Sequence, residues 1–417
     1  MKKITTLIII IFTLLEVRGE WKDTTLRVDF GIYGQGEVMD IRDIRFINIP
    51  GWYGKKNRMT EVPLAGNASV KITDAEGDTV YHHTFSTLFN EWYSGERNNG
   101  QPAYFENTLL LPMPVDSVGI HIRFNDMHHR PIMEKTITYH PVRSETTQAD
   151  MTPKYPVRII RYGGEDAINV CILAEGYRAD EMNRFFVAAE RGVNELMSYA
   201  PFSDYPEAFN FYAVGTPSAE SGVSKPSSGL SYDSAFGTHF DTFGSEKYLT
   251  VTKVHKMHDA LAGIPYQHII VLGNTPEYGG SGIYNHCMVM AADSDRFLPA
   301  FVHEFGHSFG GLADEYYKEE IEEGIYPLDV EPWEPNVTTL KEFGSKWVGM
   351  LAPGTPIPTP SESVHLYPVG LYEGGGYVSK GVYRPANECR MRNNTYSTFC
   401  PVCQSALRRA IITGLHY

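Results

Sequence analysis

The sequence predicts an α+β fold, in which an N-terminal antiparallel β-sandwich precedes an α/β domain of alternating strands and helices. Two patterns predict this division. Apolar residues alternate with polar ones up to about residue 150, and strands alternate with helices beyond residues 144–153, which are polar and aperiodic. A chain of 417 residues also exceeds what one hydrophobic core usually organises. We therefore expect two domains, over residues 20–150 and 151–417.

Residues 1–19 have the layout of a secretory signal peptide. Lys2 and Lys3 precede an apolar run over residues 4–15, which is too short to cross a hydrocarbon core of roughly 30 Å. We expect this segment to be removed, and an uncleaved N-terminal anchor is the alternative. No later stretch approaches the roughly 20 apolar residues of a spanning helix. The mature chain is therefore expected to be secreted, periplasmic or on the cell surface.

The first domain is expected to consist of half-buried strands. Its apolar residues recur with period two at Leu26, Val28 and Phe30, and again over residues 118–124. Turn-like clusters such as residues 74–78 separate these runs, and no stripe with a period of 3.6 residues stands out. This pattern favours an antiparallel sandwich.

The second domain is expected to alternate strands and helices. Its predicted strands cover residues 157–161, 168–174, 209–214, 268–272 and 286–292. Its predicted helices cover residues 182–196, about 245–261, a segment beginning near Arg296, and 402–412. Frequent proline and glycine between Tyr317 and Gly381 indicate loops.

The chain is acidic, with 50 acidic residues against 36 basic ones and a net charge of -14. No basic cluster indicates a nucleic-acid-binding face, and an acidic surface disfavours anionic partners. We therefore expect no nucleic-acid partner, and the sequence leaves the oligomeric state open.

The strongest functional signal is the pattern His303-Glu304-x-x-His307 within the apolar stretch 301–310. Side chains four residues apart share one face of a helix, so the two histidines can direct imidazole nitrogens at one zinc ion. Glu304 lies one step around the helix, where it can hold a water and act as general base. Gly311 suits a left-handed exit that turns the chain back towards the metal.

A catalytic zinc usually keeps three protein ligands and one open position. Asp314, just beyond the glycine turn, is the first choice for the third ligand, and Glu315 is the second. A glutamate from a later helix, as in thermolysin-like sites, is a further alternative. Its candidates are Glu319, Glu320, Glu322 and Glu323.

The string over residues 303–316 resembles the active-site segment of the immunoglobulin A peptidase family, metzincin-like zinc metallopeptidases with a β-rich N-terminal domain. Similar segments occur across most of residues 155–417, at 174–177, 334–338, 371–377, 383–385, 389–391 and 399–403. The resemblance implies a metzincin-like catalytic domain with one catalytic zinc ion. One departure concerns the third ligand, which usually follows the second histidine by six residues, where this sequence has Ala313.

The resemblance also implies further site residues. Met391 is expected to form a Met-turn, whose side chain packs beneath the metal without binding it. Tyr396 is the first choice for a tyrosine that stabilises the oxyanion, and its rivals are Tyr316, Tyr317 and Tyr377. In metzincins an edge strand beside the helix binds the substrate backbone, and residues 284–292 are the candidate here. The glycine-rich residues 278–282 are expected to form a flexible rim.

Three of the five cysteines, Cys389, Cys400 and Cys403, crowd near the C-terminus. The Cys-Pro-Val-Cys spacing is also found in redox and metal sites. A thioredoxin-like site, however, lies at the start of a helix in a βαβ unit, and the sequence predicts no such unit here. In an exported protein we expect a structural disulfide among the three, with the pairing open.

The leading hypothesis is a secreted zinc endopeptidase that hydrolyses peptide bonds in proteins with metal-activated water and Glu304 as base. Immunoglobulin-like and glycoprotein substrates are among the candidates, and the sequence indicates no specific substrate-binding residues. The alternative is an exported surface-binding protein in which the sandwich recognises a ligand and the metal site is inactive. A zinc hydrolase that acts on a non-peptide bond would use the same water chemistry.

Overall fold

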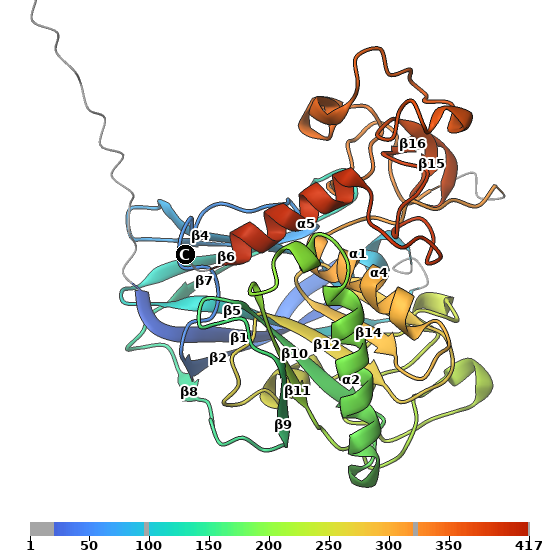
Figure 1. Cartoon of the computed structure of the whole chain (residues 1–417). Helices are drawn as coiled ribbons and strands as arrows, with labels where there is room; N and C mark the ends of the chain where they lie inside the picture. Colours follow the sequence, from blue (N-terminus) through green and yellow to red (C-terminus); the bar gives the residue numbers. More distant parts are fainter. Residues whose placement is uncertain (1–20, 96–99, 320–323, 416–417) are drawn as a thin grey trace, which may run out of the picture.

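The computed structural model describes residues 21–95, 100–319 and 324–415. The expected signal peptide, residues 1–19, lies outside this part of the chain, as do Glu320, Glu322 and Glu323. Figure 1 shows the N-terminal strands (blue to cyan) beside a second body of strands and helices (green to red). Among the helices that the structure describes, none combines the length and the hydropathy that crossing a membrane requires.

The N-terminal domain contains two four-stranded sheets, with the strand orders β5-β1-β2-β8 and β4-β3-β6-β7. The strands are β1 (Trp21–Gln35), β2 (Val38–Pro50), β3 (Ala68–Thr73), β4 (Thr79–Phe85), β5 (Ala103–Pro114), β6 (Val118–Asn125), β7 (Pro131–Tyr139) and β8 (Thr146–Gln148). Neighbouring strands are antiparallel, except that β8 runs parallel to β2. The expected antiparallel arrangement therefore does not extend to β8. The sequence did not predict this strand, because it contains no apolar residue.

Side chains from both sheets fill one hydrophobic core. In β6 every second residue is buried, from Val118 to Phe124, and Leu26 and Phe30 of β1 are fully buried. Burial of each such large apolar side chain contributes about 1.5–3 kcal/mol. The period of two in the sequence thus corresponds to the inward face of each sheet.

A short helix, α1 (Leu88–Ser94), follows β4 and adds Phe89 and Trp92 to this core. Thr87 caps the helix by accepting a hydrogen bond from the backbone N–H of Asn90 at 3.4 Å. The periodicity did not predict α1, because a helix of two turns is too short to repeat an apolar stripe.

The second domain contains a six-stranded sheet with the order β13-β14-β12-β10-β11-β9. Its strands are β9 (Val157–Arg161), β10 (Ile168–Glu175), β11 (Phe209–Val214), β12 (His268–Gly273), β13 (Gly280–Ile283) and β14 (Cys287–Ala291). The four inner strands are parallel, and the edge strands β9 and β13 are antiparallel to their neighbours. All residues of β10 are buried, which is typical of a parallel strand covered on both faces.

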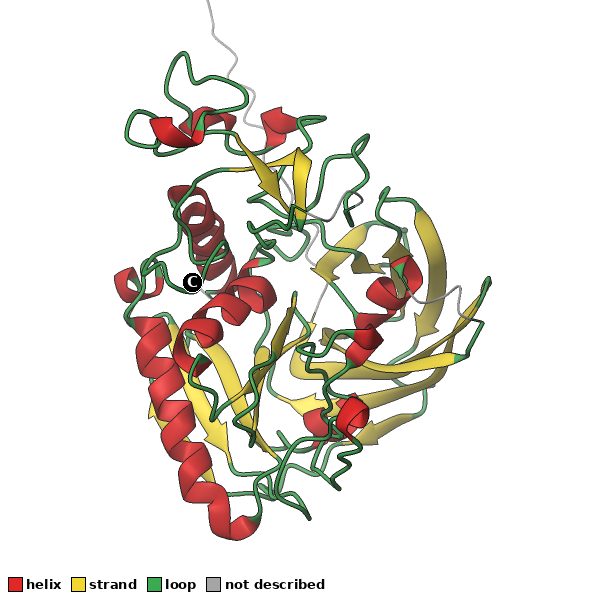
Figure 2. Ribbon diagram, turned by 90° about the vertical axis from the view of Figure 1, so that its right-hand side faces the viewer, coloured by secondary structure: helices red, strands yellow, loops and turns green. Residues whose placement is uncertain are grey.

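Four helices and a hairpin complete this domain. They are α2 (Met182–Met197), α3 (Val254–Asp259), α4 (Phe297–Gly310), α5 (Pro401–Gly414) and the strands β15 (Tyr372–Gly375) and β16 (Val378–Arg384). Helix α4 packs against α2, α5, β13 and β14. Figure 2 shows the long helices on one side of the molecule and the N-terminal strands on the other.

Two segments of this domain differ from the sequence expectation. The helix predicted over residues 245–261 is limited to α3, because Asp241, Phe243 and Gly244 just before that segment have positive φ, and the chain through residue 253 runs as loop. The glycine-rich residues 278–282, expected to be a flexible rim, contribute to the edge strand β13. Strand β14, the expected substrate-binding edge, therefore lies inside the sheet.

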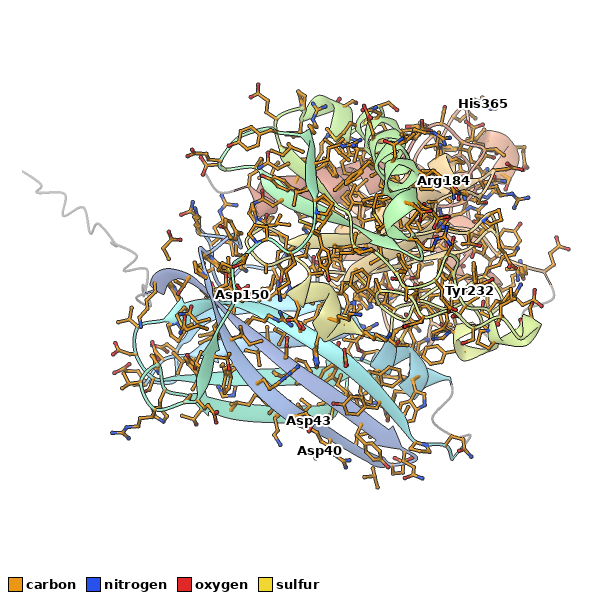
Figure 3. The ribbon with its side chains drawn as sticks, turned by 90° about the horizontal axis from the view of Figure 1, so that it is seen from below. Asp40, Asp43, Asp150, Arg184, Tyr232 and His365 are labelled. Carbon is orange, nitrogen blue, oxygen red and sulfur yellow. The ribbon has the colours of Figure 1, made fainter. Side chains whose placement is uncertain are left out.

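The two domains meet where α3 packs against β5. Arg27 of β1 is 3% exposed and pairs with Asp29 at 2.8 Å, and its Nη1 donates to Asp259 of α3 at 2.7 Å. Its Nη2 also donates to the carbonyl of His255 at 2.9 Å. Figure 3 shows the N-terminal strands, with Asp40 and Asp43 on β2, beneath the second domain, and Asp150 where the chain passes between them.

Replacing Arg27 by Ala should lower the free energy of unfolding by about 3 kcal/mol, because the buried Asp29 carboxylate is then left with the Thr108 hydroxyl at 2.7 Å and the exposed Arg45 at 3.5 Å. Arg42→Ala is the matched control, since the side chains of Arg42 and Asp40 are 44% and 48% exposed and such pairs contribute about 0–1 kcal/mol. Thermal and urea unfolding of both variants checks this. Equal destabilisation by the two substitutions would contradict it.

Four histidines line a pocket between the domains, His83 from β4, His258 from α3, His268 from β12 and His286 before β14. Burial lowers the pKa of His83 to about 3 and the pKa values of His268 and His286 to about 4. These values lie below the value of about 6.5 in an unfolded chain. The folded state therefore binds fewer protons, and stability falls as the pH drops from about 6.5 towards 4.

We predict that Tm declines over this pH range, and that His268→Leu makes the decline shallower by removing one of these buried histidines. His365→Leu is the control, because His365 is exposed and does not line the pocket. Differential scanning calorimetry between pH 7 and pH 4 measures the slope. If the slope of Tm against pH were unchanged in His268→Leu, His268 would not contribute to the loss of stability at low pH.

Candidate metal centre

Helix α4 carries three stripes of side chains, because residues four apart share a face. The stripes are aromatic (Phe301, Phe305 and Phe309), small (Gly306 and Gly310) and polar (His303 and His307). The rings of Phe305 and Phe309 stack 5.2 Å apart and both contact Phe202. The aromatic stripe thereby anchors the helix in the core, which leaves the histidines on a different face.

The small residues let neighbouring segments approach the helix closely. A Cβ at Gly306 would lie 2.9 Å from the sulfur of Met391, and one at Gly310 would lie 2.5 Å from Leu407 of α5. Strand β13 approaches through Gly282, where a Cβ would lie 2.2 Å from the carbonyl oxygen of Glu304. Met391 is fully buried and its sulfur faces Gly306, the residue before His307. This is where a Met-turn is expected to lie.

Backbone carbonyls orient both imidazole rings. The Nδ1–H of His303 donates to the carbonyl of Arg390 at 3.0 Å, and that of His307 donates to the carbonyl of Leu312 at 2.5 Å. Since each Nδ1 faces an acceptor, each Nε2 is free to offer a lone pair. The two Nε2 atoms lie 3.0 Å apart. Outer hydrogen bonds of this kind are typical of metal-binding histidines.

The chain leaves α4 through a left-handed turn at Gly311, whose φ is 59°. The backbone N–H of Gly311 bonds to the carbonyl of His307, and that of Leu312 bonds to the carbonyl of Gly306. This turn brings Asp314 back to the helix. One carboxylate oxygen of Asp314 lies 3.0 Å from His303 Nε2 and 3.5 Å from His307 Nε2.

The residues present fit a metal ion. Ligands at about 2.0–2.1 Å in a tetrahedron lie about 3.3 Å from one another, close to the three distances between these donor atoms. Burial lowers the pKa of His307, but Asp314 raises it, with a net rise to about 9. Three lone pairs that face one another thus require a cation between them, which is either a proton or a metal ion.

Glu304 lies beside the three donors without joining them. Burial raises the pKa of its carboxyl group, while the charges of His303 and His307 lower it. A raised pKa brings a carboxylate closer to the pH at which a general base works.

The structure separates the tyrosine candidates. The hydroxyl of Tyr377 donates to the second carboxylate oxygen of Asp314 at 2.5 Å, and the ring of Tyr316 packs edge-on against Tyr377. Tyr317 lies beneath the guanidinium of Arg384. Tyr396 is half-buried on the turn after Met391.

The two carboxylates that sequence reasoning left open lie in different places. Glu315 turns away from the histidines, and its backbone N–H donates to the carbonyl of Met391. Its carboxylate lies among Cys389, Cys400 and Cys403. Glu319, the one described candidate for a thermolysin-like ligand, is exposed.

The expected structural disulfide is absent. All five cysteines fall within the described residues, and all five are free thiols. Sequence spacing predicted that Cys389, Cys400 and Cys403 would be close together, which is correct, but it did not indicate that a buried glutamate joins them. The Cys-x-x-Cys motif was the signal that pointed to this cluster.

Comparisons with known families cover most of the chain. Residues 159–367 and 362–411 match the model of the family IgA Peptidase M64, and residues 18–135 match the model named Peptidase M64 N-terminus. No curated protein shows significant similarity to the chain. The matches confirm the resemblance carried by the active-site segment, and they include the metal centre and the β-rich domain. The chain belongs to the IgA peptidase M64 family.

Proposed function

We propose that this protein is an exported zinc endopeptidase that uses His303, His307 and Asp314 as metal ligands and Glu304 as general base. Membership of a metallopeptidase family supports a metal-dependent peptidase. The observation that carries the finer proposal is the convergence of two imidazole nitrogens and one carboxylate oxygen within 3.0–3.5 Å, next to a carboxylate that is not a ligand.

Each side chain has a distinct task in peptide hydrolysis. His303, His307 and Asp314 would hold the zinc ion, which when bound would act as a Lewis acid on the scissile carbonyl and increase the acidity of a water. Glu304 accepts the proton of that water and then delivers it to the leaving amine. Tyr377 orients the Asp314 carboxylate by its hydrogen bond. Tyr396 donates to the oxyanion that forms from the scissile carbonyl.

We also propose the finer fold descriptions. The two N-terminal sheets, which share one core, form a β-sandwich over residues 20–150. Residues 151–417 form a metzincin-like domain, supported by the antiparallel edge strand β13 beside α4 and by Met391 beneath the helix. Residues 1–19, as a signal peptide that is cleaved after export, would direct this enzyme to the exterior of the cell, where protein substrates are available.

Glu304→Gln should reduce peptide cleavage by about 10²–10⁴-fold, because it removes the general base. The zinc content should not change, since Glu304 is not a ligand. Mass spectrometry of the products from a proteome-derived peptide library, with and without a chelator, measures cleavage. Glu190→Gln is the matched control, because Glu190 is an exposed glutamate on another helix, α2.

Two outcomes would contradict the proposal. If Glu304→Gln retained the wild-type rate, another group would have to serve as base. If the wild-type protein bound zinc but cleaved nothing in the library, the surface-binding alternative would replace the enzyme, with the N-terminal domain as the recognition module.

The two tyrosines should have separable effects. Tyr377→Phe removes the donor to Asp314 and should weaken zinc binding by about 10–100-fold. Tyr396→Phe removes an oxyanion donor and should lower kcat by about 10²-fold or more, with the zinc affinity unchanged. Competition with a chromophoric chelator and steady-state kinetics at saturating zinc distinguish them. Unchanged kcat in Tyr396→Phe would remove this residue from the mechanism.

A further inference from the structure

A second group of ligand-type side chains lies behind the metal centre. The carboxylate of Glu315 and the sulfurs of Cys389, Cys400 and Cys403 offer four atoms within 4.8 Å of one another. Each of these residues is at most 2% exposed. They come from three segments, the turn after α4, the turn before Met391 and the N-terminus of α5.

The spacing of the donor atoms fits a metal and excludes a disulfide as the present state. The sulfurs of Cys389 and Cys403 lie 3.7 Å apart, far beyond the bonded distance of about 2.05 Å. Thiolates bound tetrahedrally to zinc at about 2.3 Å lie about 3.8 Å apart. An oxygen of Glu315 lies 3.0 Å from the sulfur of Cys403 and 3.9 Å from that of Cys400. A tetrahedral oxygen and sulfur pair would lie about 3.5 Å apart.

The hydrogen bonds around the cluster leave one strong acceptor unpaired. The Oε1 atom of Glu315 accepts from Asn336 at 2.9 Å, but Oε2 is buried and has no hydrogen-bond partner among the described residues. An unpaired buried carboxylate oxygen is destabilising unless a cation binds it. The orphaned oxygen belongs to the carboxyl group whose Oε1 faces the sulfurs, so a cation bound to this group would compensate for its burial.

Backbone N–H groups and a helix N-terminus face two of the three sulfurs. The backbone N–H of Cys400 donates to the sulfur of Cys389 at 3.2 Å, and that of Cys403 donates to the sulfur of Cys400 at 3.5 Å. Cys400 caps α5, a helix of 14 residues whose N-terminal dipole favours a thiolate. Buried Arg384 adds a positive charge that interacts with Glu315.

We propose that Glu315, Cys389, Cys400 and Cys403 bind a second, structural zinc ion. Three thiolates select zinc over the hard cations calcium and magnesium, and four protein ligands leave no position for a substrate. The buried ligands close the site to solvent. The ion links the turn after α4, the turn before Met391 and the N-terminus of α5, which is the structural role that the sequence assigned to a disulfide.

The site also has a consequence for the catalytic centre, and this part rests on the proposed function. Glu315 follows Asp314 directly, and Cys389 precedes Arg390, whose carbonyl orients His303. Met391 comes next and accepts a hydrogen bond from the N–H of Glu315. A zinc ion bound here holds the third catalytic ligand, the carbonyl that positions His303 and the Met-turn in one arrangement.

Metal analysis of the purified full chain tests the proposal. Inductively coupled plasma mass spectrometry should find two zinc ions per chain in the wild type and one in the double variant His303→Ala, His307→Ala. X-ray absorption of that double variant should show a zinc site rich in sulfur at about 2.3 Å. Cys403→Ser should lose this zinc, whereas Cys171→Ser, which changes a buried cysteine on β10, should keep both ions.

The double variant keeps the test valid even if Cys403→Ser fails to fold, because its cysteine cluster is intact. Five free thiols per denatured, chelator-treated chain are expected, and three would reveal a disulfide and overturn the proposal. A double variant without zinc, or with iron, would also overturn it. If the double variant keeps one zinc but the wild type cleaves no peptide, only the proposed function fails.

Discussion

The geometry of the candidate metal centre depends on two backbone carbonyls that fix the imidazole rings of His303 and His307. Because these carbonyls accept the Nδ1 protons, both Nε2 lone pairs converge on one point, and a cation must occupy it. The carbonyls belong to Leu312 and Arg390, which lie on segments far apart in sequence. The geometry of the site is therefore a property of the whole second domain and not of α4 alone.

Close packing is what brings those segments to the helix. Glycines at positions 282, 306 and 310 remove the side chains that would separate α4 from β13, Met391 and α5. The aromatic stripe of Phe305 and Phe309 holds the opposite side of the helix in the core. The close approaches at the glycines and the packing of the phenylalanine rings together fix the position of His303 and His307 relative to Met391 and β13.

Local patterns were predictable from the sequence, and features that depend on distant contacts were not. The spacing of His303 and His307 is read from helical periodicity, and the period of two in β6 gave its buried face. The choice between Asp314 and Glu315 depends on how the chain turns after Gly311, which neighbouring residues do not reveal. The short α3, the edge strand β13 and the glutamate among the cysteines likewise depend on backbone angles and packing partners outside their own segments.

The adjacency of Asp314 and Glu315 constrains how such enzymes can diversify. Their side chains serve two separate clusters, so a residue inserted or deleted between His307 and Glu315 would break both at once. The stretch from Glu315 to Cys389 also contacts both clusters from within, because Asn336 donates to Glu315 and Tyr377 donates to Asp314, and it includes the hairpin of β15 and β16. Evolution can therefore lengthen or reshape the loops of this stretch only where Asn336 and Tyr377 keep these two contacts.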